Sequence, residues 1–553
     1  MSEDAAGDAD TDALRSAVLD DAAASLRASS PLGRPDESYL RESLFEFAWP
    51  ESFDLVDDYW VREPFAHVAL FGDPESGEQR YVVTEPALDE FESHVRKDVA
   101  DRVRTRLLDD EYGSAEQGRE RFREDFESLL AEEARHVDPG VRHVVAYYLR
   151  RDFLGYGEID PFMQDPHVED LHVDGADVPA FVYHDRHGNL ETNRSWGDDR
   201  LDEMTVRLAQ RTGRHLSASR PLLTSTLPDG SRIQVTLGTD VATRGSNFTV
   251  RKFREEPFTP PELARLGTYT VEELAYLWLA IEHNRSVLFV GPTASGKTTS
   301  MNACSLFVPP DAKVVSIEET REIGLPHDNW ISNVTRESDV GDGRPEVGMY
   351  GLLSEALHQR PTHILVGELR TDPEVVYTFF QAVGTGHAGF STFHADTADD
   401  ALRRLRNDPL SIPDELAAEI DVVAVQHLME VDGDRVRKNR SLTEVHPADD
   451  PDESRPELRS VFAYDPTADE TSQRSASRLL AEVAREQGWT DAELRTKLER
   501  RRRLLGHLVG SDTTGYEAVT NRLFRFARRP DAVLDELDEE PIPETRPVRV
   551  QDV

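Results

Sequence analysis

The stretch Ser286–Phe307, SVLFVGPTASGKTTSMNACSLF, decides the fold of the second half of the chain. Its first residues, Ser286–Val290, are apolar and favour a short buried strand, and the residues from Lys297 onward favour a helix. Between them, Gly291–Thr298 fits the pattern G-x-x-x-x-G-K-[ST], in which a glycine-rich loop joins a strand to the start of a helix. Backbone N–H groups of such a loop and the dipole of the helix bind phosphate. The stretch therefore predicts a nucleotide-phosphate site on an α/β fold.

The residue types in this loop have separate roles. Gly291 and Gly296 permit backbone angles and a close approach of phosphate that a Cβ atom would prevent. Lys297 is expected to bridge the β- and γ-phosphates, and the Thr298 hydroxyl to ligate Mg²⁺. We expect the nucleotide to contact Gly291, Pro292, Thr293, Ala294, Ser295, Gly296, Lys297, Thr298 and Thr299.

Two further predicted strands end in carboxylates. The run KVVSIEE brings Glu318 and Glu319 to the end of one strand, and THILVGELR brings Glu368 to the end of another. Open parallel sheets bind ligands at the carboxyl ends of their strands, so these glutamates should lie near the loop. One carboxylate can organise Mg²⁺ and its waters, and another can orient or deprotonate the attacking water.

The segment GTGHAGFSTFHAD, residues 384–396, contains His387 and His394. Two histidines seven residues apart lack a third cysteine or histidine at a ligand spacing, which disfavours a metal centre there. Their chemistry leaves open a phosphate-sensing role, a contact with another subunit, or a place in the core.

The order of these motifs resembles the type II/type IV secretion-system ATPases, a superfamily that drives type II secretion, type IV pili and the archaellum. The motifs are the loop at residues 291–298, an acidic box at 317–327, the strand end at 364–368 and a histidine box at 386–395. In the first half, FLGYGEIDPFMQDP and LPDGSRIQVTLGT also resemble the archaeal branch of this superfamily.

This resemblance assigns expected roles to individual residues. It implies that Glu318 activates the water and that Glu368, together with Thr298 and Glu319, lies on the Mg²⁺ side. It also implies that His387, with His394, senses the γ-phosphate. The implied phosphate-reaching arginines of the N-terminal domain are Arg220, Arg232 and Arg251, with Arg244 as a further candidate.

The resemblance also implies a fold and partners. The expected fold is a RecA-like P-loop core with a parallel sheet, a mixed α+β N-terminal domain and a helical C-terminal extension. The expected protein is a cytoplasmic homo-hexamer that hydrolyses ATP with Mg²⁺ and docks peripherally on a polytopic membrane platform protein. Its process would be assembly of a type IV pilus-like filament from pilin-like subunits, or related secretion. Archaellum assembly and rotation, with archaellin filaments, is the alternative.

Composition shifts along the chain predict the domain boundaries. The segment around 254–266 contains three prolines and is a predicted linker. Hairpin turns are predicted at 187–189 and 228–230, and a capping box at Thr490–Glu493 opens a late helix. The predicted domains are an acidic, partly disordered tail at 1–60, a mixed α/β domain at 61–253, the linker at 254–266, the P-loop domain at 267–445, and a helical extension with an acidic tail at 446–553.

The overall charge restricts the function further. The 553 residues include 63 Lys and Arg against 106 Asp and Glu, a formal net charge of −43. This acidity disfavours a nucleic-acid binder and leaves a DNA-translocating P-loop motor as the rival from another class. Abundant carboxylates with few lysines are typical of salt-loving archaea, because high salt screens the repulsion. The single cysteine, Cys304, excludes an intrachain disulfide and a four-cysteine zinc site.

The sequence also bears on the location of the protein and on the role of one basic run. No apolar run reaches the roughly 18 to 20 residues that span a bilayer, and the acidic N-terminus lacks a signal-peptide pattern, so a cytoplasmic location is expected. The run Arg500–Arg503 is read as a solvated or partner-facing side of a helix, with a nucleic-acid contact as the alternative.

Overall fold

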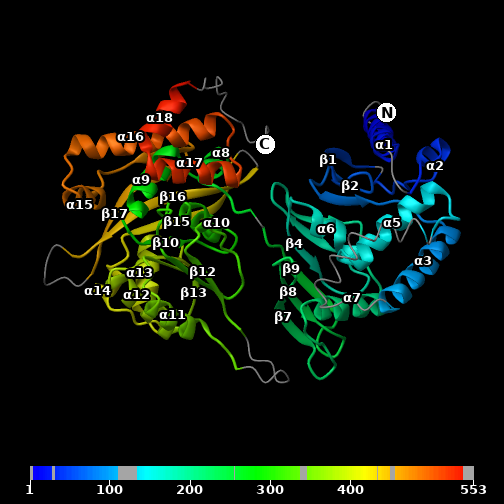
Figure 1. The fold of residues 1–553 in the computed structure, drawn as a ribbon, viewed down its shortest axis with the longest axis horizontal. Coiled ribbons are helices and arrows are strands. Elements are labelled where there is room, and N and C mark those ends of the chain that lie inside the picture. Colours follow the sequence, from blue (N-terminus) through cyan, green and yellow to red (C-terminus); the bar gives the residue numbers. More distant parts are fainter. Residues whose placement is uncertain are drawn as a thin grey trace. The chain divides into compact units, whose positions relative to one another are not determined.

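A computed structural model describes residues 4–27, 32–50, 52–109, 132, 134–254, 256–336, 345–431, 434–448 and 455–539 (Figure 1). The chain divides into two compact units, Met1–Phe253 and Arg254–Val553. None of the described helices is both long and apolar enough to cross a bilayer.

The described residues of the N-terminal unit form a mixed nine-stranded sheet in the order β1-β2-β3-β6-β5-β4-β9-β8-β7. All neighbouring strands are antiparallel except β3 and β6. The predicted turn at 228–230 lies between β7 and β8, whereas β5 and β6 are joined by residues 185–187, two residues before the turn predicted at 187–189. The strands are β1 (Asp54–Arg62), β2 (Ala66–Gly72), β3 (Gln79–Thr84), β4 (Val168–Val173), β5 (Phe181–His184), β6 (Gly188–Thr192), β7 (Leu222–Thr226), β8 (Arg232–Thr236) and β9 (Asn247–Arg251).

Helices cover this sheet and enclose several apolar cores. Residues of α6 and α7 pack on the core of β2–β9, whereas α1, α2 and α5 share a second core. The helices are α1 (Asp4–Leu26), α2 (Glu37–Glu42), α3 (Glu90–Asp109), α5 (Pro139–Phe153), the 3-10 turn η1 (Gly157–Ile159), α6 (Asp160–Gln164) and α7 (Asp198–Arg211). The helical periodicity of the sequence predicts helices over residues 96–155, and part of that range lies outside the described residues.

The acidic N-terminal segment differs from the sequence prediction. A partly disordered tail followed by one or two short helices was expected before residue 60; α2 is such a short helix, but residues 4–26 form the longer helix α1. Val18, Ala22 and Leu26 recur at a spacing of four residues, lie on one helix face and are buried against Leu40 and Val144. Because acidic residues dominate the composition of this segment, the composition did not indicate this narrow apolar helix face.

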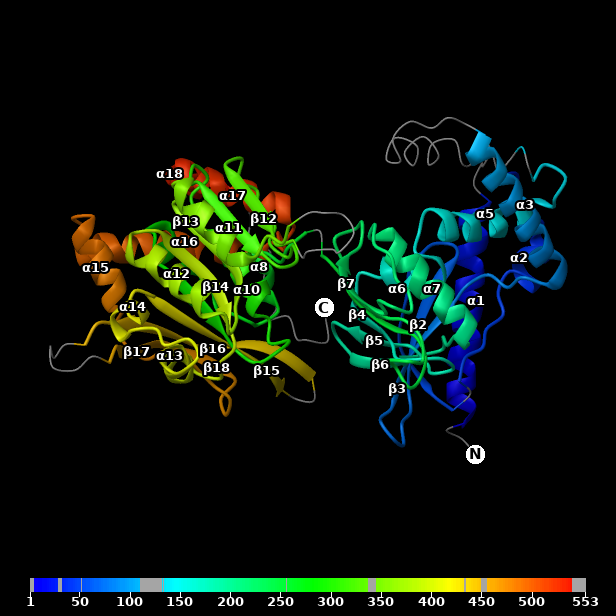
Figure 2. The ribbon, with the colours of Figure 1, turned by 90° about the horizontal axis from the view of Figure 1, so that it is seen from below.

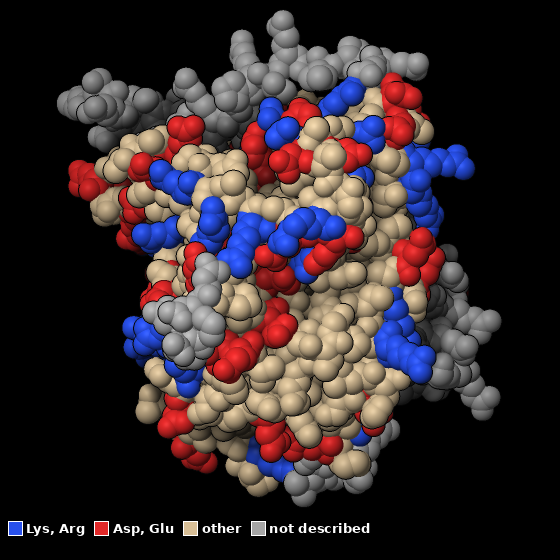
Figure 3. Space-filling model, turned by 90° about the vertical axis from the view of Figure 1, so that its left-hand side faces the viewer, with Lys and Arg blue, Asp and Glu red and all other residues tan. Residues whose placement is uncertain are grey.

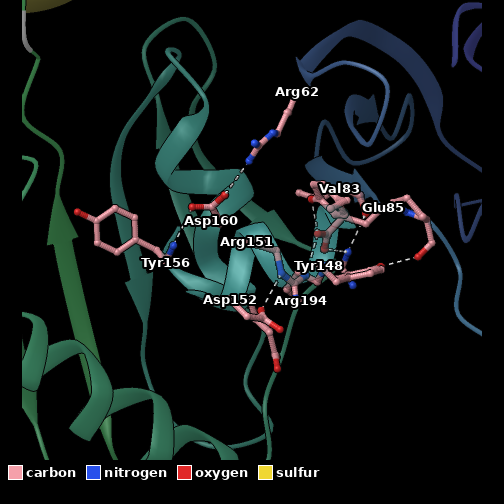
Figure 4. A network of polar contacts seen from close by, with 12 residues as sticks. Arg62, Val83, Glu85, Tyr148, Arg151, Asp152, Tyr156, Asp160 and Arg194 are labelled. Carbon is pink, nitrogen blue, oxygen red and sulfur yellow. Dashed lines mark hydrogen bonds and ion pairs between the residues drawn. The ribbon is translucent and has the colours of Figure 1, made fainter. Parts of the chain in front are cut away.

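A buried carboxylate ties helix α5 to the sheet (Figure 4). Glu85, just after β3, accepts hydrogen bonds from Arg151 Nη1 at 2.8 Å, Tyr147 OH at 2.6 Å and Arg194 Nη2 at 2.8 Å. The Arg151 guanidinium also lies 4.6 Å from the centre of the Tyr148 ring. The charge of Glu85 is therefore compensated from both the helix and the sheet.

The C-terminal unit contains the predicted parallel sheet. The strand order is β12-β11-β13-β14-β10-β15-β16-β17-β18, and the pairs from β12 to β15 are parallel while the remaining pairs are antiparallel. The strands are β10 (Val287–Val290), β11 (Val314–Glu318), β12 (Trp330–Val334), β13 (His363–Leu369), β14 (Ala388–Phe393), β15 (Val422–Val431), β16 (Asp434–His446), β17 (Glu457–Asp465) and β18 (Glu470–Gln473).

Helices lie on both faces of this sheet (Figures 1 and 2). Alternate residues of β10 point to opposite cores: Phe289 packs with α9, α10 and α16–α18, and Val290 with α11–α14. The helices are α8 (Pro260–Arg265), α9 (Val271–Glu282), α10 (Lys297–Ser305), α11 (Met349–His358), α12 (Pro373–Gly384), α13 (Ala398–Arg406), α14 (Asp414–Ala417), α15 (Arg478–Glu486), α16 (Asp491–Gly510), α17 (Tyr516–Arg528) and α18 (Pro530–Glu539). The three layers confirm an α/β P-loop core.

Two segments of this unit differ from the sequence prediction. Within the predicted linker at 254–266, Thr259 caps helix α8, and Pro260 and Pro261 are buried. The predicted helical extension at 446–553 begins with the hairpin β17–β18, which pairs with the long strand β16 and extends the sheet. Helices α15–α18 follow as predicted, and the capping box of Thr490 and Glu493 is formed at α16.

Candidate functional site

The glycine-rich loop lies at the carboxyl edge of the parallel sheet. Val290, which precedes it, pairs with Phe393 of β14 and Val425 of β15. A Cβ atom on Gly291 would collide with the carbonyl oxygen of Gln426 in β15, so this position requires glycine. Gly296 has φ +86°, the left-handed region that favours glycine, and it begins helix α10 without a side-chain cap. The first N–H groups of α10 are therefore left for an anion.

The side chains of the loop support this arrangement. Ser295 Oγ donates to the Pro292 carbonyl oxygen at 2.8 Å, and Lys297 Nζ donates to the same oxygen at 2.7 Å. Ser295 and Lys297 are buried, while Pro292, Thr293 and Ala294 form the exposed tip. Thr298 and Thr299, in the first turn of α10, are half-buried.

Glu318 is the buried carboxylate of the site. It ends β11, and its side chain is 2% exposed. Its Oε1 accepts hydrogen bonds from the backbone N–H groups of Glu322 at 2.8 Å and Ile323 at 2.9 Å, whereas its buried Oε2 has no hydrogen-bond partner in the described protein. Burial raises the pKa of Glu318 to about 7, despite the two backbone hydrogen bonds. Glu318 is therefore held in place by one oxygen and can gain or lose a proton near neutral pH.

Glu319 and Glu368 form a second, more exposed acidic group. Arg370 joins them, with Nη1 at 2.7 Å from Glu319 Oε2 and Nε at 2.7 Å from Glu368 Oε2. His394, which follows β14, places Nε2 2.7 Å from Glu368 Oε1. The two carboxylates therefore share one guanidinium group at the carboxyl ends of β11 and β13.

His387 is not at this edge, which corrects its predicted role. It precedes Ala388, the first residue of β14, which pairs with His363 at the start of β13. Its Nδ1 lies 2.7 Å from the carbonyl oxygen of Pro361, at the amino edge of the sheet. Seven residues of extended chain span about 23 Å, so His387 and His394 lie at opposite edges. Within one chain, only His394 is placed to act near the loop.

Strand register brings two of the candidate arginines of the N-terminal unit together. Arg232 begins β8 and is directly opposite Arg251, which ends β9. Alternation along both strands places Arg232 and Arg251 on the exposed sheet face, away from Ile233 and Val250. Arg220 precedes β7, and Arg244 lies in the β8–β9 connection, so both belong to the other end of these strands, about 13 Å away. Among the four arginines, Arg232 and Arg251 are therefore the two that strand pairing brings directly together.

Two further side chains hold the loop and helix α10 in place, and neither was predicted from the sequence. Asn302 of α10 donates to Glu322 O at 3.0 Å and accepts from Gly324 N at 3.2 Å, which ties α10 to the segment that holds Glu318. Arg437 of β16 donates from Nε to Ala294 O at 3.2 Å. Asn302 lies four residues after Thr298, on the same helix face, and this spacing could have predicted that its side chain lies near the site. Arg437 is brought in by strand pairing, which the sequence pattern does not reveal.

A strand, glycine loop and uncapped helix, bordered by acidic strand ends on a parallel sheet, define a P-loop NTPase. Residues 158–502 match the family model described as "Type II/IV secretion system protein", and residues 17–87 match "PilB3-like, N-terminal". The first match covers well over half of the chain. The chain therefore belongs to the type II/IV secretion system protein family.

The chain is also similar to individual proteins and solved structures. An uncharacterized protein of Methanocaldococcus jannaschii is 33% identical over 497 residues, which cover 85% of this chain and 88% of the relative. The type IV secretion system protein PtlH of Bordetella pertussis is 32% identical over 246 residues, which cover 40% of this chain and 72% of PtlH. Among solved structures, the ATPase DotB of Legionella pneumophila matches with a TM-score of 0.36 and 16% identity, over 67% of this chain and 92% of DotB.

Proposed function

We propose that this protein is an Mg²⁺-dependent ATPase that powers assembly of a type IV pilus-like filament or related secretion. The observation that carries the proposal is Glu318, a buried carboxylate with one oxygen fixed by backbone N–H groups and the other without a partner. It lies on the same sheet edge as the phosphate-binding loop. A carboxylate with a pKa near 7 can accept the proton of an attacking water.

The remaining residues of the site have distinct tasks in this proposal. The N–H groups of the loop and of α10, with Lys297, bind the phosphates and stabilise the charge that develops on them. Mg²⁺, held by Thr298 and, directly or through water, by Glu319 and Glu368, would neutralise charge on the phosphate oxygens. Asn302 keeps Glu318 in register with α10, and His394 orients Glu368.

The oligomer and its location are parts of the same proposal. Arg232 and Arg251 are directly opposite each other on neighbouring strands, and two guanidinium groups so placed can bind an anion such as phosphate. We propose that a neighbouring subunit of a homo-hexamer supplies this anion as the phosphate of its bound ATP. The hexamer would act in the cytoplasm, docked on a polytopic membrane platform protein beneath pilin-like filament machinery.

Two other processes remain as alternatives. An archaellum motor would use the same ATPase with archaellin filaments. Neighbouring genes for archaellins rather than pilin-like proteins would favour this alternative.

A DNA-translocating motor needs a basic channel, but acidic and basic side chains are interspersed on the face shown in Figure 3. In the run Arg500–Arg503, Arg501 is buried against Glu282 and Trp278, and Arg500 pairs with Asp531 at 2.9 Å. Stimulation of ATP hydrolysis by DNA would support the DNA-translocating motor instead.

The Lys297→Ala variant tests the phosphate site. We expect the purified parent protein at high salt to hydrolyse ATP, and the variant to lose both nucleotide affinity and turnover by about a hundredfold or more, because the loop loses its only lysine. ATP turnover, nucleotide binding and oligomeric mass with and without nucleotide are measured together. Lys313→Ala, altered outside the loop, serves as the matched control. Unchanged activity in Lys297→Ala would refute the assignment of the loop.

A further inference from the structure

A cluster of histidines in the N-terminal unit has no role in the nucleotide site. His167 precedes β4, and His184 and Asp185 lie where β5 turns toward β6. Asp185 Oδ2 is 3.1 Å from His167 Nδ1, and Asp185 Oδ1 is 3.2 Å from His184 Nδ1. One ligating atom from each residue lies within 4.8 Å of the others. His187 lies next to the cluster, with its ring 5.0 Å from that of His184.

The protonation of His184 is set by its neighbours. Its Nδ1 lies 3.2 Å from the backbone N of Arg186, and because that N–H can only donate, Nδ1 is an acceptor. The proton of the neutral ring is then on Nε2, which faces the Tyr59 hydroxyl at 3.2 Å. Tyr59 in turn donates to Asp165 at 2.9 Å. This chain of contacts fixes the fully buried ring of His184, with Nδ1 accepting from the backbone N–H groups of Arg186 and His187 and lying 3.2 Å from Asp185 Oδ1.

Two acceptors therefore face each other inside the unit. Asp185 Oδ1 is buried and makes no hydrogen bond within the described protein, yet it lies 3.2 Å from an imidazole nitrogen that carries a lone pair. The backbone N–H groups of Arg186 and His187 point at this nitrogen, and a cation between the two acceptors would take their place and satisfy both atoms. Three neighbouring ligand atoms and a fixed tautomer are typical of metal centres in proteins.

We propose that His167, His184 and Asp185 bind a first-row transition metal ion of the Zn²⁺ type. Bond lengths of about 2.0 to 2.2 Å in a tetrahedral site separate the ligand atoms by about 3.3 to 3.6 Å, so the two pairs at 3.1 and 3.2 Å need to move apart only slightly to bind an ion. Imidazole nitrogens favour Zn²⁺, Co²⁺ or Ni²⁺ over Mg²⁺ and Ca²⁺. A water molecule completes the coordination. The ion joins the β5–β6 turn to the segment before β4 and stabilises this end of the sheet.

Metal titration of the full-length protein tests this site. Chelator-treated protein without nucleotide is titrated with Co²⁺ and then with Zn²⁺, and both the visible absorption of Co²⁺ and the thermal unfolding midpoint are recorded. We expect one equivalent of Co²⁺ to give a tetrahedral spectrum that Zn²⁺ abolishes, and Zn²⁺ to raise the unfolding midpoint. X-ray absorption of the zinc-loaded parent should show two imidazole ligands.

Variants assign the ligands. His167→Gln and Asp185→Asn change partly exposed side chains, and each should weaken metal binding at least about tenfold. His172→Gln is the matched control, because His172 lies in β4 of the same sheet and its Nδ1 faces Thr249 at 3.4 Å. Circular dichroism without metal checks that each variant is folded. The proposal would be overturned if the parent showed no saturable binding at micromolar metal concentrations, or if all variants bound the metal equally well. His167 and Asp185 would then form a hydrogen-bonded pair without a metal ion.

Discussion

Glu318 shows how local structure changes the chemistry of a side chain. In water a glutamate is ionised at neutral pH, but at the end of β11 it is buried, and only one of its oxygens is hydrogen-bonded. Desolvation outweighs the two backbone hydrogen bonds and raises its pKa to about 7. The same burial that makes Glu318 costly to ionise makes it a useful base.

The pH dependence of hydrolysis follows from this pKa. The base acts only when it is deprotonated, so turnover should rise as the pH increases through 7 and reach a plateau above it. Between pH 8 and pH 6 we expect turnover at saturating ATP to fall about tenfold. Steady-state hydrolysis across this range, with nucleotide affinity measured in parallel, checks the expectation. A flat profile would mean that Glu318 does not accept the proton.

At the residue scale, the sequence predicted the loop and the strand-end glutamates because both follow from local rules. A glycine loop between a strand and a helix, and a carboxylate after a buried run, need no knowledge of distant contacts. Arg370 was missed, although it stands two residues from Glu368, because its pairing with Glu319 depends on β11 and β13 being neighbours.

At the scale of elements, the error over His387 came from treating two histidines as one motif. The residues between them, AGFSTF, form the whole of strand β14 and are all buried. A buried strand with one histidine at each end separates the two side chains, and that information was present in the sequence. The hairpin β17–β18 was harder to predict, because only the pairing of β17 with β16 brings it into the sheet.

The buried network around Glu85 allows a test of how elements are joined in the N-terminal unit (Figure 4). Glu85→Ala leaves the guanidinium of Arg151, whose side chain is 5% exposed, without its main partner. Breaking a buried ion pair in this way should lower the free energy of unfolding by about 3 kcal/mol. Chemical denaturation followed by fluorescence measures the change. Glu75→Ala, in the exposed β2–β3 turn, should leave stability within about 0.5 kcal/mol of the parent. A similarly small effect of Glu85→Ala would show that the network does not hold α5 to the sheet.

At the scale of the whole molecule, the two units carry complementary parts of the proposed reaction. The C-terminal unit contains the loop and the carboxylates, and the N-terminal unit presents Arg232 and Arg251 on an exposed face. The sequence predicted this division from the change of pattern near residue 254. It did not predict that Arg232 and Arg251 are direct cross-strand neighbours, because strand register determines which residues are adjacent.

Mixing two inactive variants tests whether the arginines act between subunits. Arg232→Ala and Glu318→Gln should each lower turnover by about a hundredfold or more. In mixed assemblies, some sites would combine an intact Glu318 with an intact Arg232 from a neighbour, so turnover should partly recover. Arg80→Ala, which removes an exposed ion pair with Glu78, should leave turnover unchanged. If the mixture stays inactive, Arg232 does not act on a neighbour's phosphate.

The most direct test compares ATP binding and hydrolysis in Glu318→Gln. The amide has the same shape, and its oxygen can still accept the hydrogen bonds from Glu322 and Ile323, but it cannot take a proton from water. We predict that ATP affinity stays near the parent value while hydrolysis falls by about 10²- to 10⁴-fold. Hydrolysis at the parent rate, with ATP bound equally well, would contradict the assignment of Glu318 as the base.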